Sequence, residues 1–302
     1  VVIATPRDAV QGSGDAYYCW EGAYVWEALT ANNGGVIDPW LAKSWEHNDD
    51  CTEWTFNLRD DAYFTDGVQF NADVCLKNIE RWGHGITSTY TTLSIEKSLP
   101  NLDKMEKVDD FTVKFTFTQP ITTLEYVLSD YGSPMYSPNC FDEETGVISD
   151  YAIGTGPYKI TDHVESEYVT LERNDNYYGE KCKVKAFKIR CIPDAETRVS
   201  ALKSGEVMGL ADNGAITMDA AKNLCDTDSS FEMDSTPSHM TEYIMFNDKN
   251  EYLADKRMRE AFNLATDRDS ICSVIYGGLL QPAYSFLSTQ STFHLDIQGT
   301  YD

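Results

Sequence analysis

Alternating apolar and polar residues mark the clearest strands of the chain. Trp54, Phe56 and Leu58 alternate with polar residues, which is the period-two pattern of a strand buried on one face. The same period runs through residues 111–118, where one face holds Phe111, Val113, Phe115 and Phe117. The pattern predicts a β-rich region in the first half of the chain.

A helix is predicted between these two strands. Cys75, Ile79 and Trp82 recur at spacings of four and three, which places them on one apolar stripe. Asn71 precedes the stripe and is a favoured N-cap residue. Asp66-Gly67 is a turn dipeptide, so we expect a tight turn before this helix.

The middle of the chain alternates between strand and helix patterns. Residues 1–5 are a short apolar run, and strands are predicted near 167–173 and 184–192. Asp194 is a potential N-cap for a helix that carries Val199 and Leu202 and stops at Gly205. The alternation predicts a mixed α/β fold.

Three further elements are predicted near the end of the sequence. Residues 241–247 are an apolar run that we interpret as a strand. Two helices should follow, the second ending at Gly277-Gly278; their apolar stripes are Met258, Phe262 and Ala265, then Ile271, Val274 and Ile275.

Composition and charge exclude several classes of protein. The chain has 302 residues, of which 42% are hydrophobic, so it can bury a core and is not a disordered protein. Its 24 basic and 49 acidic residues give a formal net charge of −25. That charge repels the phosphates of nucleic acid and anionic lipid, and it favours neutral or cationic ligands. No apolar run approaches the roughly 18 residues of a membrane-spanning helix.

The eight cysteines do not form a metal-binding or redox motif. None of them are spaced as CxxC, which disfavours zinc knuckles and thioredoxin-like sites. We expect mostly free thiols, with Cys75 and Cys191 as small apolar core residues. Disulfides remain an alternative because the count is even and an extracytoplasmic location permits them.

Motifs for catalysis or metal binding are missing from the sequence. Gly154-Thr155-Gly156-Pro157 lacks the Lys-Ser/Thr of a phosphate loop and is best interpreted as a tight loop that enters a strand. HExxH and GxSxG do not occur, and the five histidines are scattered. Residues 174–179 have the start of a calcium loop, but its twelfth position is Lys185. We therefore expect no enzyme, no resident metal and no cofactor.

Ten short blocks, in order along most of the chain, resemble one known family. They are 39–46 (PWLAKSWE), 54–59 (WTFNLR), 64–67 (FTDG) leading to Phe70, 154–158 (GTGPY), 173–179 (RNDNYYG), 192–198 (IPDAETR), 201–206 (ALKSGE), 246–247 (FN), 259–268 (REAFNLATDR) and 275–278 (IYGG). These blocks are similar to those of the family 5 extracellular solute-binding proteins of ABC importers, which include oligopeptide-, dipeptide- and nickel-binding proteins.

The resemblance implies a fold and a domain plan. The fold is α/β, periplasmic-binding-protein-like of type II, with two α/β lobes and an inserted β-rich subdomain. We map the first lobe to residues 1–38 and 152–238, and the inserted subdomain to 39–151. The second lobe starts at residue 239 and is incomplete at 302, since the family's members are longer; we expect a C-terminally truncated chain.

The resemblance also implies a function without chemistry. Such proteins act outside the cytoplasm, in the periplasm or at the cell surface as lipoproteins, close over a solute by hinge motion and deliver it to an ABC permease. We expect a monomer. Candidate ligand-binding residues lie on loops at strand ends; they are Tyr18, Cys19, Trp20, Tyr131, Gly132, Ser133, Asp212, Asn213, Gly214, Phe246 and Asn247. Alternatively, Tyr18 and Trp20 pack under their loop and Asp212 caps a turn or helix.

The ligand is left open between alternatives. Residues 40–61 are especially similar to the nickel-binding branch of the family. That branch holds an anionic metal chelate with arginines, and the corresponding places near 87–90 and 131–133 are uncharged here. A short peptide is therefore the leading hypothesis, a nickel or other metal chelate is the second, and a surface sensor or adhesin is the alternative of another class.

Overall fold

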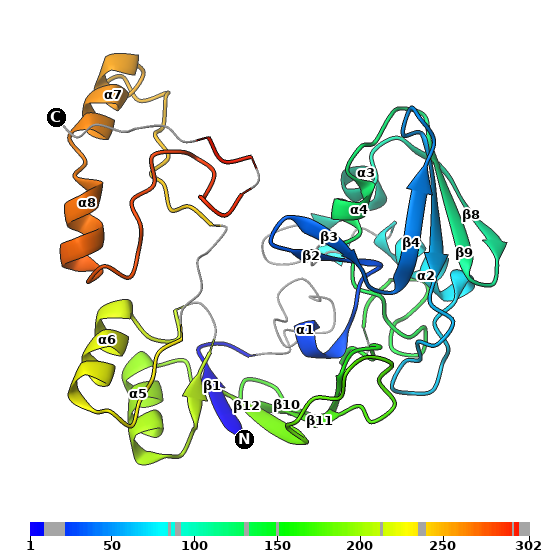
Figure 1. Cartoon of the computed structure of the whole chain (residues 1–302), viewed down its shortest axis with the longest axis horizontal. Helices are drawn as coiled ribbons and strands as arrows, with labels where there is room; N and C mark the ends of the chain where they lie inside the picture. Colours follow the sequence, from blue (N-terminus) through cyan, green and yellow to red (C-terminus); the bar gives the residue numbers. More distant parts are fainter. Residues whose placement is uncertain are drawn as a thin grey trace. The chain divides into compact units, whose positions relative to one another are not determined.

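Two separate units, Val1–Ala215 and Ile216–Asp302, make up the computed structural model of the chain (Figure 1). The structure describes residues 1–8, 22–83, 86–87, 92–129, 133–148, 151–211, 214–234, 240–291 and 293–295. Each unit is described by itself below. The lobe boundaries expected at 39, 152 and 239 stay predictions.

A four-stranded antiparallel sheet forms the β-rich part of the first unit, in the order β4-β5-β9-β8 (Figure 1). Its strands are β4 (Ala42–His47), β5 (Glu53–Leu58), β8 (Leu102–Asp109) and β9 (Thr112–Phe117). Trp54 lies opposite Phe115 and Phe56 opposite Val113, so the two alternating patterns share one buried face. The strands predicted from both patterns are confirmed.

Helix α2 (Ala72–Trp82) packs on that face. The side chain of Asn71 accepts a hydrogen bond from the backbone N–H of Val74 at 3.0 Å, which satisfies one free donor of the first turn. Cys75, Ile79 and Trp82 are each at most 1% exposed. The predicted cap and apolar stripe are therefore confirmed.

Short elements complete the first unit. The helices are α1 (Gly22–Val25), α3 (Ile95–Ser98) and α4 (Leu124–Val127), and two antiparallel ribbons pair β2 (Thr30–Asn33) with β3 (Val36–Pro39) and β6 (Ile86–Thr87) with β7 (Thr92–Leu93).

A mixed five-stranded sheet, in the order β10-β11-β12-β1-β13, forms the other part of the first unit. Its strands are β1 (Val2–Thr5), β10 (Tyr158–Val164), β11 (Tyr168–Arg173), β12 (Ala186–Cys191) and β13 (Gly209–Leu210). Strand β1 is parallel to both of its neighbours, whereas β10, β11 and β12 are antiparallel. The parallel strands and their helical connection give this sheet its α/β character.

Both faces of the five-stranded sheet are covered. Ile3 and Ile189 contribute to one cluster together with Val25 of α1, whereas Ala4 contributes to another cluster with Ala201 of α5 (Ala195–Ser204). Because neighbouring residues of a strand point to opposite faces, β1 supplies both cores.

Helix α5 begins and ends where the sequence predicted. Asp194 accepts from the backbone N–H of Thr197, and Gly205 ends the helix with a left-handed φ of +75°. The buried face differs from the expected one, however: Arg198 and Ala201 are buried, whereas Val199 and Leu202 are half-buried.

The second unit contains helices α6 (Met218–Thr227), α7 (Lys256–Leu264) and α8 (Arg268–Ser270), the last continuing as a short π-helix, Ile271–Ile275. The two helices predicted after residue 255 are thus present. The strand expected at 241–247 is wrong, because these residues have no strand conformation. None of the described residues pairs with this segment in a sheet, and Ile244 and Met245 are both 79% exposed.

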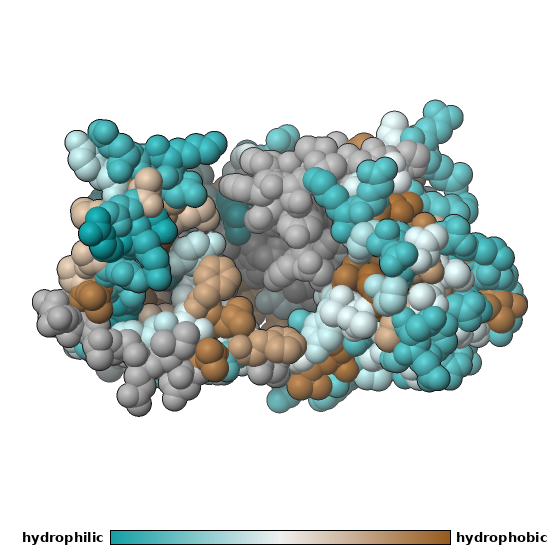
Figure 2. Space-filling view, turned by 90° about the horizontal axis from the view of Figure 1, so that it is seen from above, coloured by the Kyte–Doolittle hydropathy of each residue, from teal (hydrophilic) through white to brown (hydrophobic). Residues whose placement is uncertain are grey.

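Hydrophobic side chains also reach the surface elsewhere, and Figure 2 shows them scattered among hydrophilic ones on one face of the molecule. Seven cysteines lie among the described residues, and all seven are free. Cys75 is buried as expected, whereas Cys191 is only half-buried.

Candidate functional site

Most of the candidate ligand-binding residues lie outside the residues that the structure describes. These are Tyr18, Cys19, Trp20, Tyr131, Gly132, Asp212 and Asn213. Ser133 and Gly214 in the first unit, and Phe246 and Asn247 in the second, can be placed. The role of all eleven residues in binding stays a prediction.

In the first unit, Ser133 is 1% exposed and is therefore a core residue. Gly214 has a φ of +77°, and its carbonyl accepts a hydrogen bond from Arg198 Nη2 at 3.2 Å. Arg198 also donates to the carbonyls of Ile192, Pro193 and Ala215 at 2.5 to 2.8 Å. This buried guanidinium holds the backbone of Gly214 and Ala215 against the start of helix α5.

In the second unit, the ring of Phe246 lies 5.5 Å from that of Phe262, centroid to centroid. The side chain of Asn247 is exposed and accepts a hydrogen bond from the backbone N–H of Lys249 at 3.1 Å, as in an Asx turn. The described partners of Phe246 and Asn247 thus lie within the second unit itself.

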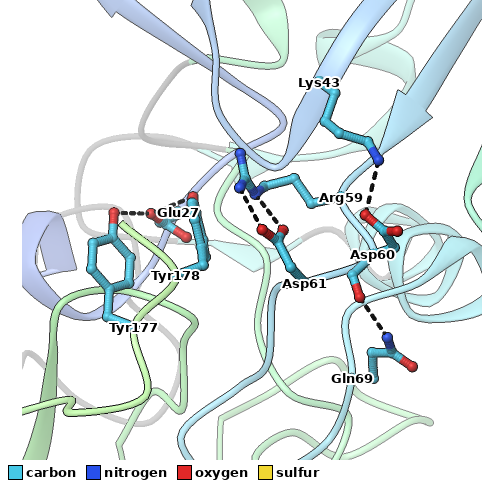
Figure 3. Close-up of polar contacts among 8 residues, drawn as sticks. All are labelled: Glu27, Lys43, Arg59, Asp60, Asp61, Gln69, Tyr177 and Tyr178. Atoms are coloured by element: carbon cyan, nitrogen blue, oxygen red, sulfur yellow. Dashed lines mark hydrogen bonds and ion pairs between the residues drawn. The ribbon is translucent and has the colours of Figure 1, made fainter. Parts of the chain in front are cut away.

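A buried carboxylate brings together segments that are far apart in the sequence. Glu27, which follows α1, is 0% exposed. Its Oε1 accepts hydrogen bonds from Trp40 Nε1 at 2.5 Å and from the hydroxyls of Tyr177 and Tyr178 at 2.7 and 2.8 Å. Its Oε2 accepts one from Thr155 Oγ1 at 2.8 Å. Figure 3 shows the two tyrosine hydroxyls directed at the carboxylate.

Burial governs the protonation of this cluster. Desolvation raises the pKa of Glu27, and the hydrogen bonds from Tyr177, Thr155, Tyr178 and Trp40 oppose that shift. Burial, together with the nearby Glu27 carboxylate, also raises the pKa of both tyrosine hydroxyls. The tyrosines therefore stay protonated and remain donors.

Arg59 extends the cluster into the four-stranded sheet. Its Cζ lies 3.9 Å from the centroid of the Tyr178 ring, which is a cation–π contact. The guanidinium also forms two hydrogen bonds to the carboxylate of Asp61 at 2.9 and 2.8 Å (Figure 3). In the same view, the exposed pair of Lys43 and Asp60 lies apart from the cluster.

The loop that carries Thr155 needs its glycines. A Cβ at Gly154 would lie 2.0 Å from the carbonyl oxygen of Val25, and one at Gly156 would lie 2.7 Å from it. Gly156 also donates its N–H to that carbonyl at 2.8 Å. The close approach brings Thr155 to Glu27 and confirms the tight loop that enters the strand starting at Tyr158.

This arrangement can hold distant segments together. Among the described residues, every side chain hydrogen-bonded to the Glu27 carboxylate is a donor to it, which suits a structural role. The groups that contact the carboxylate are a Trp, a Thr and two Tyr residues, each of which donates a hydrogen bond. Within the described part of the chain, no three His, Cys, Asp or Glu residues are placed to hold a metal ion. Glu27 was not among the predicted site residues, although an acidic residue inside the apolar run 25–29 was a signal for it.

Solved structures of the same class match the whole chain. A substrate-binding protein of an ABC transporter from Sinorhizobium meliloti matches with a TM-score of 0.81 and 26% identity, covering 100% of this chain and 62% of that one. NikZ from Campylobacter jejuni, in complex with Ni(L-His), matches with a TM-score of 0.80 and 26% identity, covering 100% and 60%. The chain therefore has the α/β fold of a periplasmic binding protein, as expected.

The family follows from the sequence. Residues 36–302 match the model of the bacterial extracellular solute-binding proteins, family 5 middle, and the chain belongs to this family. It is a family of solute-binding proteins rather than enzymes.

The chain is also similar to a protein that binds glutathione. The glutathione-binding protein GsiB of Escherichia coli (strain K12) is 28% identical over 247 residues, which are 80% of this chain and 46% of GsiB. The chain thus spans about half the length of this relative. Among the described helices, none has the length and apolarity to cross a bilayer.

Proposed function

We propose that this chain captures short peptides outside the cytoplasm for import by an ABC permease. The similarity to GsiB carries the proposal, because it extends over 80% of the chain and glutathione is itself a tripeptide. Membership of the family supports the transport role.

Capture requires closure rather than chemistry. A solute that contacts both lobes only when they are closed shifts the equilibrium toward the closed form, which the permease then receives. The candidate contacts combine aromatic walls such as Trp20 and Phe246 with polar groups such as Asn213 and Asn247. Asn side chains and free backbone groups can pair with a peptide main chain.

The net charge narrows the peptide class. At −25, the protein attracts cationic solutes and repels anionic ones. We therefore place neutral and cationic di- to pentapeptides ahead of glutathione, which carries two carboxylates and one ammonium group. The protein acts as a monomer in the periplasm, or at the cell surface if it is lipid-anchored.

A nickel–histidine chelate is the second candidate. The 26% identity to NikZ in complex with Ni(L-His) favours it. Because the described residues offer no cluster of three metal ligands, the ion would have to arrive inside its own chelator.

Isothermal titration of the 302-residue chain separates the candidates. Neutral and lysine-containing tripeptides, glutathione, and Ni²⁺ with L-histidine are titrated in turn, with Ni²⁺ alone as the control. We expect saturable heat with the tripeptides, strongest for the cationic one. Heat only with the nickel–histidine mixture overturns the peptide proposal in favour of the chelate. Silence with every solute overturns both and favours a sensor or adhesin.

A further inference from the structure

Glu27 occupies a position where packing alone would select an apolar residue. It lies inside the run 25–29, where Ala28 and Leu29 are also 0% exposed. A carboxylate is buried at a large energetic cost unless hydrogen bonds or opposite charges compensate for it. The four donors around Glu27 supply that compensation, and each comes from a side chain that the sequence places elsewhere.

These donors come from both parts of the first unit. Trp40 lies between β3 and β4, on the side of the β-rich part. Thr155 lies in the loop before β10, and Tyr177 and Tyr178 lie between β11 and β12, on the side of the five-stranded sheet. Glu27 thus ties the two parts together through one side chain.

The resemblance blocks converge on this carboxylate. PWLAKSWE supplies Trp40, GTGPY supplies Thr155, and RNDNYYG supplies Tyr177 and Tyr178. WTFNLR supplies Arg59, whose guanidinium lies over the Tyr178 ring. Blocks that are separated by more than a hundred residues therefore have one shared structural purpose.

The backbone of Glu27 connects the cluster to candidate binding residues. The N–H of Met135 donates to the carbonyl of Glu27 at 2.8 Å, and Ser133 lies two residues before Met135. Along the sequence, Trp20 precedes Glu27 by seven residues. The candidate residue Ser133 thus lies on a segment that is hydrogen-bonded to Glu27.

We propose that Glu27 is a positioning residue that joins the β-rich part to the five-stranded sheet and thereby sets the place of the solute-binding segments. This proposal rests on the proposed function. Glu27 does not touch the solute; it acts through the segments that it holds.

The chemistry of the donors calls for acceptor oxygens at this position. The indole N–H of Trp40 can only donate, whereas the hydroxyl of Thr155 can also accept, so Glu27→Gln keeps an acceptor for Trp40 only by turning its NH2 group toward Thr155, whose hydrogen bond must then reverse. The titratable and charged groups that face the carboxylate are Tyr177, Tyr178 and Arg59, and Arg59 is itself paired with Asp61. No other carboxylate is among them in the described part of the chain.

The test compares Glu27→Gln with Asp60→Asn, an exposed ion-pair variant from the same region (Figure 3). Both are measured under conditions where circular dichroism shows them fully folded. We expect Glu27→Gln to weaken tripeptide binding about tenfold, because disturbing the hydrogen bonds of a buried group costs about that much and the segments held by these bonds then lose their binding geometry. Asp60→Asn should change it less than about twofold, because an exposed pair contributes little.

Amide hydrogen exchange measures, without any solute, how firmly Glu27 holds the segments that donate to it. We expect faster exchange at residues 153–157 and 174–179 in Glu27→Gln and unchanged exchange there in Asp60→Asn. Unchanged affinity together with unchanged exchange in folded Glu27→Gln overturns the proposal. Faster exchange with unchanged affinity also overturns it, because Glu27 would then be structural only.

A pH series adds a readout that only the carboxylate can give. The folded-state pKa of Glu27 is raised, so its contribution to stability is complete below the usual pKa of 4.5 and is lost as the pH rises through the folded-state value. The stability of the wild type relative to Glu27→Gln should therefore increase as the pH falls through that window. A pH-independent difference would show that residue 27 does not titrate with a raised pKa, and it would contradict the buried place of this side chain in the cluster.

Two milder variants cover the case in which Glu27→Gln does not fold. Thr155→Val and Tyr178→Phe each remove one donor and should change affinity and exchange in the same direction by a smaller amount. If the wild type binds no solute at all, the proposed function fails. Hydrogen exchange and the pH series then still decide whether Glu27 joins the two parts of the first unit.

Discussion

The two units differ in how far they bury their apolar side chains. The first unit buries four hydrophobic clusters, with Trp54, Phe56 and Phe115 each at most 2% exposed. In the described part of the second unit, the buried hydrophobic residues are Ala221 and Leu224. Large side chains there, such as Val274 and Phe293, are 78% and 79% exposed. A hydrophobic pattern therefore identifies a face, but other segments must supply what covers it.

Strand neighbours explain much of this difference. Strand β5 is hydrogen-bonded to β4 on one side and to β9 on the other, and α2 packs over the shared face. Residues 241–247 have a comparable apolar content but no described strand beside them. If the two units differ in packing in this way, matched substitutions in them will have unequal effects on stability.

The largest effect is expected from adding a methyl group to a glycine. Gly154→Ala places a Cβ 2.0 Å from the Val25 carbonyl oxygen, which forces the backbone apart and should cost more than about 4 kcal/mol of unfolding free energy. Gly278→Ala in the second unit meets nothing within 4 Å and adds only the strain of a φ of +80°, about 1 kcal/mol. Urea denaturation measures both. Equal losses would contradict the comparison.

Truncation of a phenylalanine tests packing directly. Phe56→Ala should destabilise the first unit by about 3–5 kcal/mol, because this side chain is 0% exposed. Phe262→Ala should cost less than about 1 kcal/mol, because Phe262 is 51% exposed. Guanidinium denaturation followed by circular dichroism gives both values. A large loss for Phe262 would contradict the difference in packing between the two units.

Arginine fixes loops in both units, with different burial. Arg198→Met leaves four carbonyl acceptors without their donor in a site that is 2% exposed, so we expect a loss of about 2–3 kcal/mol. Arg259→Met removes two bonds, to the carbonyls of Leu253 and Ala254, at a half-buried site and should cost less than about 1 kcal/mol. Thermal unfolding of the two variants ranks them, and the reverse order would contradict this reasoning.

Helix caps should show the smallest difference. Asn71→Ala and Asp255→Ala each remove a side-chain acceptor from a helix N-terminus and should each cost about 1 kcal/mol. Because a cap is a local interaction, its loss should be similar in both units. Chemical denaturation of the pair checks this; a much larger loss for Asn71 would mean that the units differ locally as well as in packing.

Local signals in the sequence were sufficient for the elements and their ends. The side chains of Asn71 and Asp194 cap the helices that they were predicted to cap, and Gly205 ends the second of them, because these preferences depend on a few neighbouring residues. The strand pattern of residues 54–58 was equally reliable, since its burial repeats every two residues.

Long-range contacts could not be predicted in the same way. Tyr178 is 151 residues from Glu27, and no local pattern encodes that pairing. Arg198 was overlooked because a charged residue on a helix is usually exposed, and here the nearby carbonyl groups make its burial favourable. The candidate loops gave the least certain predictions, since their residue types suit turns as well as ligand binding.

The position of β1 has a consequence for how the chain is made. Residues 2–5 are synthesised long before the strands with which they pair, Lys188–Cys191 and Gly209–Leu210. One edge of this strand therefore stays open until residue 191 has been synthesised, and the other edge until residue 210. An unpaired strand of this kind is a site for unwanted association, so the nascent chain has a long interval in which a chaperone can hold it in an extended form.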